Sequence, residues 1–294
     1  MKLVNEMQAL KKENTGYKVF VIFNAVLMAL VVLVTLYPVL YIVAQSFSSE
    51  QELIKGTVGI IPRGFNLNTY KYVLTTNDYE FLGYYRNTII YTVIGTVLSL
   101  VFSATLAYPL SKSELKFNRF LTPFIIFTMY FGGSLITNYV LVIRLGLSNK
   151  VSAFILPMMI STYYVILMRS FFVSLPKDIE EAGEIDGLNK FGVFIRIALP
   201  LSKPIMATMT LFYSVMYWNN WFQAFLYLQK EKWPVSYYLQ TIIRGQGNAD
   251  ADATSVAKNI KACSMVLTVL PIICVYPFIQ KYYVQGMMLG GVKE

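Results

Sequence analysis

Six long stretches of this 294-residue chain contain no charged residue, and they constrain the fold more than any other feature. Each stretch is 18 to 31 residues long, and an α-helix needs about 20 apolar residues to cross the hydrocarbon core of a bilayer. Backbone that is not helical cannot face lipid, because each of its unpaired amides costs several kcal/mol. We therefore expect an all-α integral membrane protein with six transmembrane helices. The six stretches are Val19–Ser49, Asn87–Ser111, Phe120–Ile143, Val151–Met168, Pro204–Gln229 and Ala262–Gln280.

Proline and glycine predict where these helices are irregular. Pro38 is expected to bend the first helix, whereas Pro123 falls in the opening turn of the third, where proline is tolerated. The pair Gly132–Gly133 should loosen the third helix near its centre. The first stretch has no small-residue cleavage signature and is too long for a secretory signal, so it is interpreted as a retained span.

Composition narrows the class of protein. Hydrophobic residues make up 56% of the chain and charged residues only 14%, against about 25% charged in soluble domains. The chain has no His, which is the commonest general base and metal ligand, and its two Cys cannot form a cysteine-rich zinc site. The basic residues flank apolar stretches instead of covering a soluble face. We expect a cell-membrane protein that is no enzyme by itself, with no metal and no nucleic-acid partner.

Lysine and arginine predict the orientation of the helices. With the N-terminus in the cytoplasm, 14 of the 25 basic residues lie inside and 11 outside. The margin is small, but the outer loops Glu50–Arg86 and Lys230–Lys261 are long, and the positive-inside rule weakens for long loops. This favours both termini inside. Residues 1–18 then form a cytoplasmic tail, and residues 19–86 form the first helix and an extracellular loop.

Two common sources of energy for transport are missing from the sequence. None of the six stretches carries an ionisable residue, so a proton relay inside the membrane is difficult to build. The chain also lacks the phosphate loop of an ATPase. If the protein moves a solute uphill, a partner supplies the energy. A secondary transporter or channel for a small polar solute, working without an ATPase, remains the alternative.

One cytoplasmic loop, Arg169–Lys203, is long enough to hold a partner. Pro176 suits a helix start, and acidic residues follow it where the helix dipole favours them. Those acidic residues are Asp178, Glu180 and Glu181. A narrow apolar stripe at helical spacing consists of Ile179, Ala182 and Ile185. Gly187 is a natural stop for this first short helix.

A second short helix is predicted after this stop. Asn189 is placed to cap a helix that carries Phe191, Phe194 and Ile195, and Leu199–Pro200 is expected to end it. Two short helices at an angle form a rigid knob that fits a groove on a partner. An ordinary solvated connector between spans is the alternative.

At these residues the chain resembles the permease subunits of ABC importers. Residues 181–187 read Glu-Ala-Gly-Glu-Ile-Asp-Gly and residues 197–200 read Ile-Ala-Leu-Pro, as in the signature of the carbohydrate-uptake, maltose-type branch. Gly183 departs from the family's usual Ala, which lowers helix propensity by ~1 kcal/mol. The resemblance runs from about Asn87 to the C-terminus and includes Trp218-Asn219 and the tail that follows Gly286.

The resemblance implies the type I importer permease fold, with a core at residues 87–284 and a cytoplasmic tail at residues 285–294. The loop between the fourth and fifth spans would be a coupling helix that docks into a cleft on the ATPase. Its coupling positions would be Asp178, Glu181, Ala182, Asp186, Gly187, Leu199 and Pro200. The tail would add a second contact through Gly290, Gly291 and Lys293, although an ordinary chain end is the alternative.

The same resemblance implies the partners. They are a second permease subunit in a membrane heterodimer, two cytoplasmic ATPase subunits and an extracellular or periplasmic sugar-binding protein. ATP and Mg²⁺ would be bound by the partner ATPase, and no cofactor is expected in this chain.

The fifth charge-free stretch combines aromatic rings with amides. Tyr213, Tyr217 and Asn220 recur at i, i+4 and i+7, on one face of a helix. Rings that stack on the C–H faces of a sugar, beside amides that bond its hydroxyls, favour an oligosaccharide substrate. The expected substrate path consists of Tyr213, Tyr217, Asn219, Asn220, Trp221 and Gln223. An aromatic belt at the outer membrane interface is the alternative.

Overall fold

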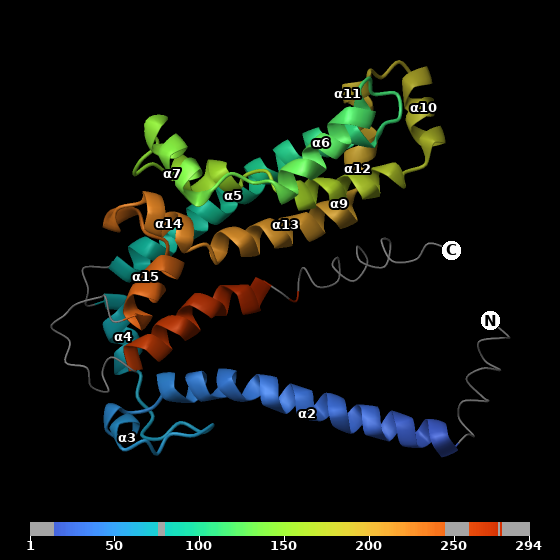
Figure 1. Ribbon diagram of the computed structural model, residues 1–294. Coiled ribbons are helices and arrows are strands. Elements are labelled where there is room, and N and C mark those ends of the chain that lie inside the picture. Colours follow the sequence, from blue (N-terminus) through green and yellow to red (C-terminus); the bar gives the residue numbers. More distant parts are fainter. Residues whose placement is uncertain (1–14, 76–79, 245–258, 276, 278–294) are drawn as a thin grey trace. The chain divides into compact units, whose positions relative to one another are not determined.

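The computed structural model describes residues 15–75, 80–244, 259–275 and 277, and every regular element in these ranges is helical (Figure 1). The chain divides into two compact units. Unit 1 comprises residues 1–73 and 249–266, and unit 2 comprises residues 74–248 and 267–294. Each unit is described by itself.

Unit 1 is dominated by the long apolar helix α2, Thr15–Ser46. Its apolar side chains from Val19 to Leu40 are exposed, as expected of a helix that faces lipid or another subunit. Pro38 lies inside the helix. Two short helices follow, α3 at Glu50–Ile54 and α4 at Asn68–Thr75.

Polar side chains close the carboxyl end of α2. The buried Ser48 donates its hydroxyl to Ala44 O at 2.6 Å and accepts the amide of Arg63 at 3.0 Å. Asn259, which is 2% exposed, donates to Ser48 O at 3.1 Å and to Thr69 Oγ1 at 2.9 Å. These bonds give the backbone groups at the end of the helix partners inside unit 1.

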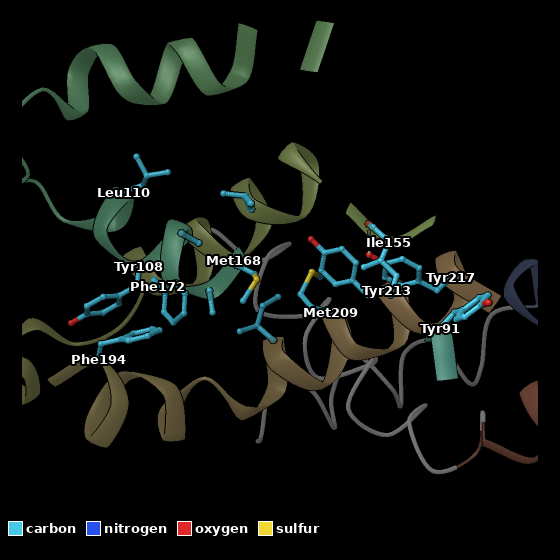
Figure 2. Packing of buried hydrophobic residues seen from close by; sticks show 14 of the residues in the cluster. Tyr91, Tyr108, Leu110, Ile155, Met168, Phe172, Phe194, Met209, Tyr213 and Tyr217 are labelled. Atoms are coloured by element: carbon cyan, nitrogen blue, oxygen red, sulfur yellow. Dashed lines mark hydrogen bonds between the residues drawn. The ribbon is translucent and has the colours of Figure 1, made fainter. Parts of the chain in front are cut away.

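Unit 2 is built around α5, Glu80–Ser111, with α9, Thr162–Val173, and α13, Lys203–Trp218, packed against it. Figure 2 shows the aromatic and methionine side chains that fill the space between these helices. Its labelled members are Tyr91, Tyr108, Leu110, Ile155, Met168, Phe172, Phe194, Met209, Tyr213 and Tyr217.

The third predicted span is broken. Helix α6, Asn118–Tyr130, and helix α7, Leu135–Arg144, meet at 106°. We predicted that Gly132–Gly133 loosens this helix. In the structure the helix does not continue through the pair: α6 ends before the two glycines and α7 begins after them. The placement of Pro123 in the opening turn was wrong, because α6 begins at Asn118 and Pro123 lies inside it.

The fourth stretch also bends. Helix α8, Val151–Ile155, continues into the 3₁₀ turn η1, Leu156–Met158, and then meets α9 at 52°. Helix α9 runs on through Arg169, whose Nε donates to Leu110 O at 2.8 Å near the end of α5. The guanidinium thereby gives a hydrogen-bond donor to a carbonyl in the last turn of α5, because carbonyls in the last turn of a helix have no partner within that helix.

Within the described ranges, two helices, Gly16–Ser46 and Phe81–Ser111, are long and apolar enough to cross a membrane alone. The number rises to five if each of three bent pairs forms one span, and Asn259–Val275 is a shorter apolar helix. The prediction of six spans with both termini inside therefore stays a prediction.

Candidate functional site

The predicted coupling helix is present as α10, Lys177–Ile185, with Pro176 at its N-cap. Asp186 is its C-cap, and Gly187 adopts a left-handed backbone with φ +88°. The amide of Gly187 donates to Glu184 O at 3.0 Å, and the amide of Leu188 donates to Gly183 O at 3.0 Å. This pair of bonds is the Schellman arrangement, which explains why Gly187 ends the helix.

The second predicted helix also starts as expected. The side chain of Asn189 accepts the amide of Gly192 at 2.7 Å and caps α11, Lys190–Val193. The prediction that Leu199–Pro200 ends this helix was wrong. A π-helical segment, η2 at Phe194–Ala198, continues into α12, Leu199–Leu201. Pro200 stands at the start of α12, where proline is tolerated, and the wider π turn changes the hydrogen-bond register just before it. The chain then turns by 80° into α13.

One face of α10 is exposed. Four predicted contact residues, at i, i+3, i+4 and i+8, are exposed and share this face. Ile185, from the predicted apolar stripe, joins them at i+7. We call it the docking face; it consists of Asp178, Glu181, Ala182, Ile185 and Asp186. Ile185 is 86% exposed, which is unusual for an isoleucine on a short, ordered helix. Leu199 is half-buried and Pro200 is exposed, on α12 rather than on this face.

On the opposite face of α10, ion pairs connect the helix to the end of α5 and to α11. Glu180, whose side chain is 12% exposed, forms an ion pair with Lys112, the residue after α5. Glu184 pairs with Lys190 at 2.6 Å. The hydrogen bonds that Lys190 donates to Glu184 and to Glu114 raise the pKa of this lysine to about 12.

The sequence reasoning missed this second face. It assigned Glu180 only to the helix dipole and gave Glu184 no role. The signal was present, because Glu180, Glu184 and Gly187 recur at i, i+4 and i+7, opposite the docking face. The departure at Gly183 also has a structural reason. A Cβ there would lie 2.3 Å from Ile197 Cδ1, so glycine permits close packing of α10 on η2.

A cavity of about 550 Å³ lies beside the inner face of α10, between the ends of α5 and α9 and the start of α11. Aromatic rings line one part of it, among them Tyr108, Phe172 and Phe191. Lys112, Glu180 and the other ion-paired side chains line the rest. The cavity therefore adjoins the Lys112–Glu180 ion pair.

The residues of the expected substrate path separate into two groups. Tyr213 and Tyr217 are 0% and 1% exposed and lie in the core. Their hydroxyls pair with Ser103 Oγ at 2.7 Å and Ser99 Oγ at 2.9 Å on α5. These hydroxyls thus have partners within the chain, and an interhelical bond of this kind contributes about 0.6 kcal/mol in membrane proteins.

Asn219, Asn220 and Trp221 form the break between α13 and α14, Phe222–Tyr227, at the end of unit 2 opposite α10 (Figure 1). Gln223 lies in the first turn of α14. Asn219 is exposed, and its side chain donates to Val215 O at 3.0 Å. Asn220 donates to Met158 Sδ, and its Oδ1 accepts the amide of Gln223 at 3.2 Å.

Trp221 is half-buried beneath Arg244, whose guanidinium carbon lies 4.9 Å from the ring centre. Sequence reasoning did not identify Arg244, because the contact joins the end of α15, Val235–Ile243, to a residue that precedes α14. The predicted tail contacts Gly290, Gly291 and Lys293 lie outside the described residues.

Comparison with known proteins places this arrangement in a family. Residues 99–289 match the family described as binding-protein-dependent transport system inner membrane component. Protein LplC of Bacillus subtilis (strain 168) is 41% identical, over 98% of this chain and 99% of its own length. The polygalacturonan/rhamnogalacturonan transport system permease protein YtcP of the same organism is 36% identical, over 89% of this chain and 93% of its own length.

A solved structure agrees with these relatives. A chain in the crystal structure of a bacterial ABC transporter involved in the import of the acidic polysaccharide alginate matches with a TM-score of 0.86 and 32% identity. The match covers 92% of this chain and 98% of that chain. The expected resemblance and the type I permease fold are therefore confirmed, and the chain belongs to the binding-protein-dependent transport system inner membrane components.

Proposed function

We propose that this chain is one of two permease subunits of an ABC importer and forms half of the path for an oligosaccharide. The match to permeases over nearly the whole length of the chain carries this proposal. YtcP is a permease of a polygalacturonan/rhamnogalacturonan transport system, and the similar solved structure is a transporter involved in the import of alginate; both support an oligosaccharide as the substrate. The protein is no enzyme; ATP and Mg²⁺ are bound and ATP is hydrolysed in a partner chain.

The docking face of α10 is the contact with that ATPase. It presents three carboxylates and the exposed side chain of Ile185. Ion pairs and the Schellman turn at Gly187 hold α10 rigidly on the opposite side. A rigid helix transmits a rotation of the ATPase to the membrane helices, whereas a flexible loop would absorb it. The tail residues Gly290, Gly291 and Lys293 are proposed as a second contact.

In the membrane, we place the chain with six spans and both termini inside, so that α10 is cytoplasmic. The break at residues 219–221 then lies toward the outer side. Irregular backbone at membrane depth is tolerated where it lines a watery cavity or is buried in protein. Because Asn219 is exposed, the break is a candidate for the substrate path. Its outer side would face the second permease subunit and the extracellular binding protein.

Purification of the N-terminally tagged chain in mild detergent tests the proposal. Mass spectrometry should identify a second permease and an ATPase with a phosphate loop. The variant Glu181→Ala should then lower ATPase retention by at least about tenfold, as expected for loss of a paired charge at an interface. The matched control Glu114→Ala removes an exposed carboxylate outside α10 and should retain the ATPase. If the chain purifies alone and still transports sugar, the proposal is wrong and the protein is a secondary transporter.

A further inference from the structure

The end of unit 2 opposite α10 is strongly basic. We call it the basic end and define it as residues 135–155 and 219–244, which include α7, α8, α14 and α15. It contains five basic residues and one acidic residue. The basic residues are Arg144, Lys150, Lys230, Lys232 and Arg244, and the acidic residue is Glu231.

The segments that carry Lys150 and Lys232 are directly connected. The amide of Asn149 donates to Tyr227 O at 2.9 Å, and Lys232 Nζ donates to Asn149 O at 2.6 Å. The rings of Tyr139 on α7 and Tyr227 on α14 stack with centroids 5.8 Å apart. The segments that carry the charges are therefore held together by backbone bonds and ring packing.

This charge is unexpected on the outer side of a membrane. Lys and Arg are favoured in short cytoplasmic loops, yet Arg144 and Lys150 flank a connection of only a few residues at this end. If α10 is cytoplasmic, topology does not account for the excess. A surface of one sign at the mouth of a path raises the local concentration of ligands of the opposite sign. The basic end therefore favours an anionic solute.

Arg244 is the residue best prepared to bind such a solute. Its guanidinium stacks over the ring of Trp221 at 4.9 Å, and its side chain is exposed. No carboxylate of the described residues lies within ion-pairing distance of it. Stacking fixes the plane of a guanidinium and leaves its N–H edge directed away from the ring, and this edge matches a carboxylate in bidentate geometry.

The residues around Trp221 supply partners for hydroxyl groups. Asn219 is exposed, and Gln223 Oε1 is buried without a hydrogen-bond partner among the described residues. A buried amide oxygen without a partner is costly, so a donor from a ligand or water is expected there. Amides within two residues of Trp221, together with the cation stacked on its ring, suit a sugar that carries both hydroxyls and a carboxylate.

We propose that the basic end selects oligosaccharides built from uronate sugars, with Arg244 as the specificity-determining residue that binds a uronate carboxylate. Trp221 is a positioning residue that orients the guanidinium. This proposal rests on the proposed function, because it requires a sugar path at the end of unit 2 opposite α10. A neutral oligosaccharide gains nothing from the five cations and leaves the guanidinium without an anion.

Binding calorimetry on the detergent-purified importer complex, without its binding protein, tests the proposal. The probes are trigalacturonate and the neutral galactotriose of the same linkage. Trigalacturonate should bind at least tenfold more tightly, and Arg244→Gln should remove about tenfold of its affinity while leaving galactotriose unchanged. Arg244→Lys should retain part of the preference, because it keeps the charge but not the bidentate geometry.

The matched control is Arg144→Gln, which removes a charge of the basic end that has no contact with Trp221. Its effect should be smaller and should disappear at high salt. Any of three results would overturn the proposal. The two probes bind equally, trigalacturonate does not bind, or Arg244→Gln binds trigalacturonate as tightly as the unaltered protein does. Co-purification of the ATPase and the second permease is scored on the same sample, so failure of the proposed function is recognised separately.

Discussion

The ion pair between Lys112 and Glu180 should be required for coupling between α10 and the membrane core. Lys112 directly follows α5, and Glu180 lies on the inner face of α10. Lys112 Nζ contacts both carboxylate oxygens of Glu180 and lies 4.5 Å from the centre of the Tyr108 ring. Among the described salt bridges, this one joins α10 directly to the end of α5.

The burial of the two side chains sets the magnitude. Unit charges about 4 Å apart attract by roughly 4 kcal/mol at an effective dielectric constant of about 20, and desolvation offsets part of this. Removing one partner of a fully buried pair costs about 3–5 kcal/mol. The side chain of Glu180 is 12% exposed but that of Lys112 is 29% exposed. We therefore expect Glu180→Gln to weaken the attachment of α10 by about 1–3 kcal/mol.

The assay is a double-mutant cycle with Lys112→Met, Glu180→Gln and the double variant in the assembled importer. Hydrogen exchange at the amides of residues 182–188 reports local detachment of α10, and sugar uptake per ATP hydrolysed reports coupling. Each single variant should raise the exchange and lower the ratio of uptake to hydrolysis. The double variant should be scarcely worse than either single variant, because the same interaction is already lost.

The control is Glu114→Gln, which breaks the exposed contact between Lys190 and Glu114. Their side chains are 67% and 77% exposed, and exposed pairs contribute little. This variant should leave both measurements unchanged. Effects of the two single variants that add within about 0.5 kcal/mol would refute the reasoning, because additivity means that Lys112 and Glu180 do not act through each other.

Three glycines give further predictions, measured as shifts in the melting temperature of the purified complex. Gly187→Ala should cost about 1–2 kcal/mol, because φ is +88° there, and Gly187→Asn should cost less since Asn tolerates this conformation. Gly183→Ala gains ~1 kcal/mol of helix propensity, and the atom that its Cβ would meet at 2.3 Å, Ile197 Cδ1, ends a flexible side chain that can rotate away. The melting temperature should therefore not fall, and a fall would show that the side chain of Ile197 is fixed in place. Gly95→Ala would place a Cβ 2.7 Å from the ring of Tyr217, and this overpacking should cost about 1–3 kcal/mol. Adding Tyr217→Leu should relieve it. An unchanged melting temperature would show that α5 and α13 are not closely packed there.

The helices α10 and α11 were predictable from sequence because their signals are local. The start at Pro176, the stop at Gly187 and the cap at Asn189 each depend on residues within one or two turns, and all three are confirmed. The course of the chain past Pro200 was not predictable from the same rules. A π segment shifts the hydrogen-bond register before this proline, and nothing in the local sequence required that shift.

The placement of Tyr213 and Tyr217 required information from a second helix. In a membrane helix the lipid-facing side and the core-facing side are both apolar, so hydrophobicity alone does not tell them apart. Small residues do, because they let two helices approach closely. On α5 the residues at successive i+4 positions are small and buried, and two of them bond the tyrosine hydroxyls. These four residues are Gly95, Ser99, Ser103 and Ala107.

Two stripes at the same spacing therefore pair across the α5–α13 interface. The tyrosines stand four residues apart on α13, as Ser99 and Ser103 do on α5, and Gly95 leaves room for the ring of Tyr217. A tyrosine matched in this way by a small residue with a hydroxyl is expected in the core. The uronate site is proposed beyond Trp218, among exposed and half-buried residues that follow these paired stripes.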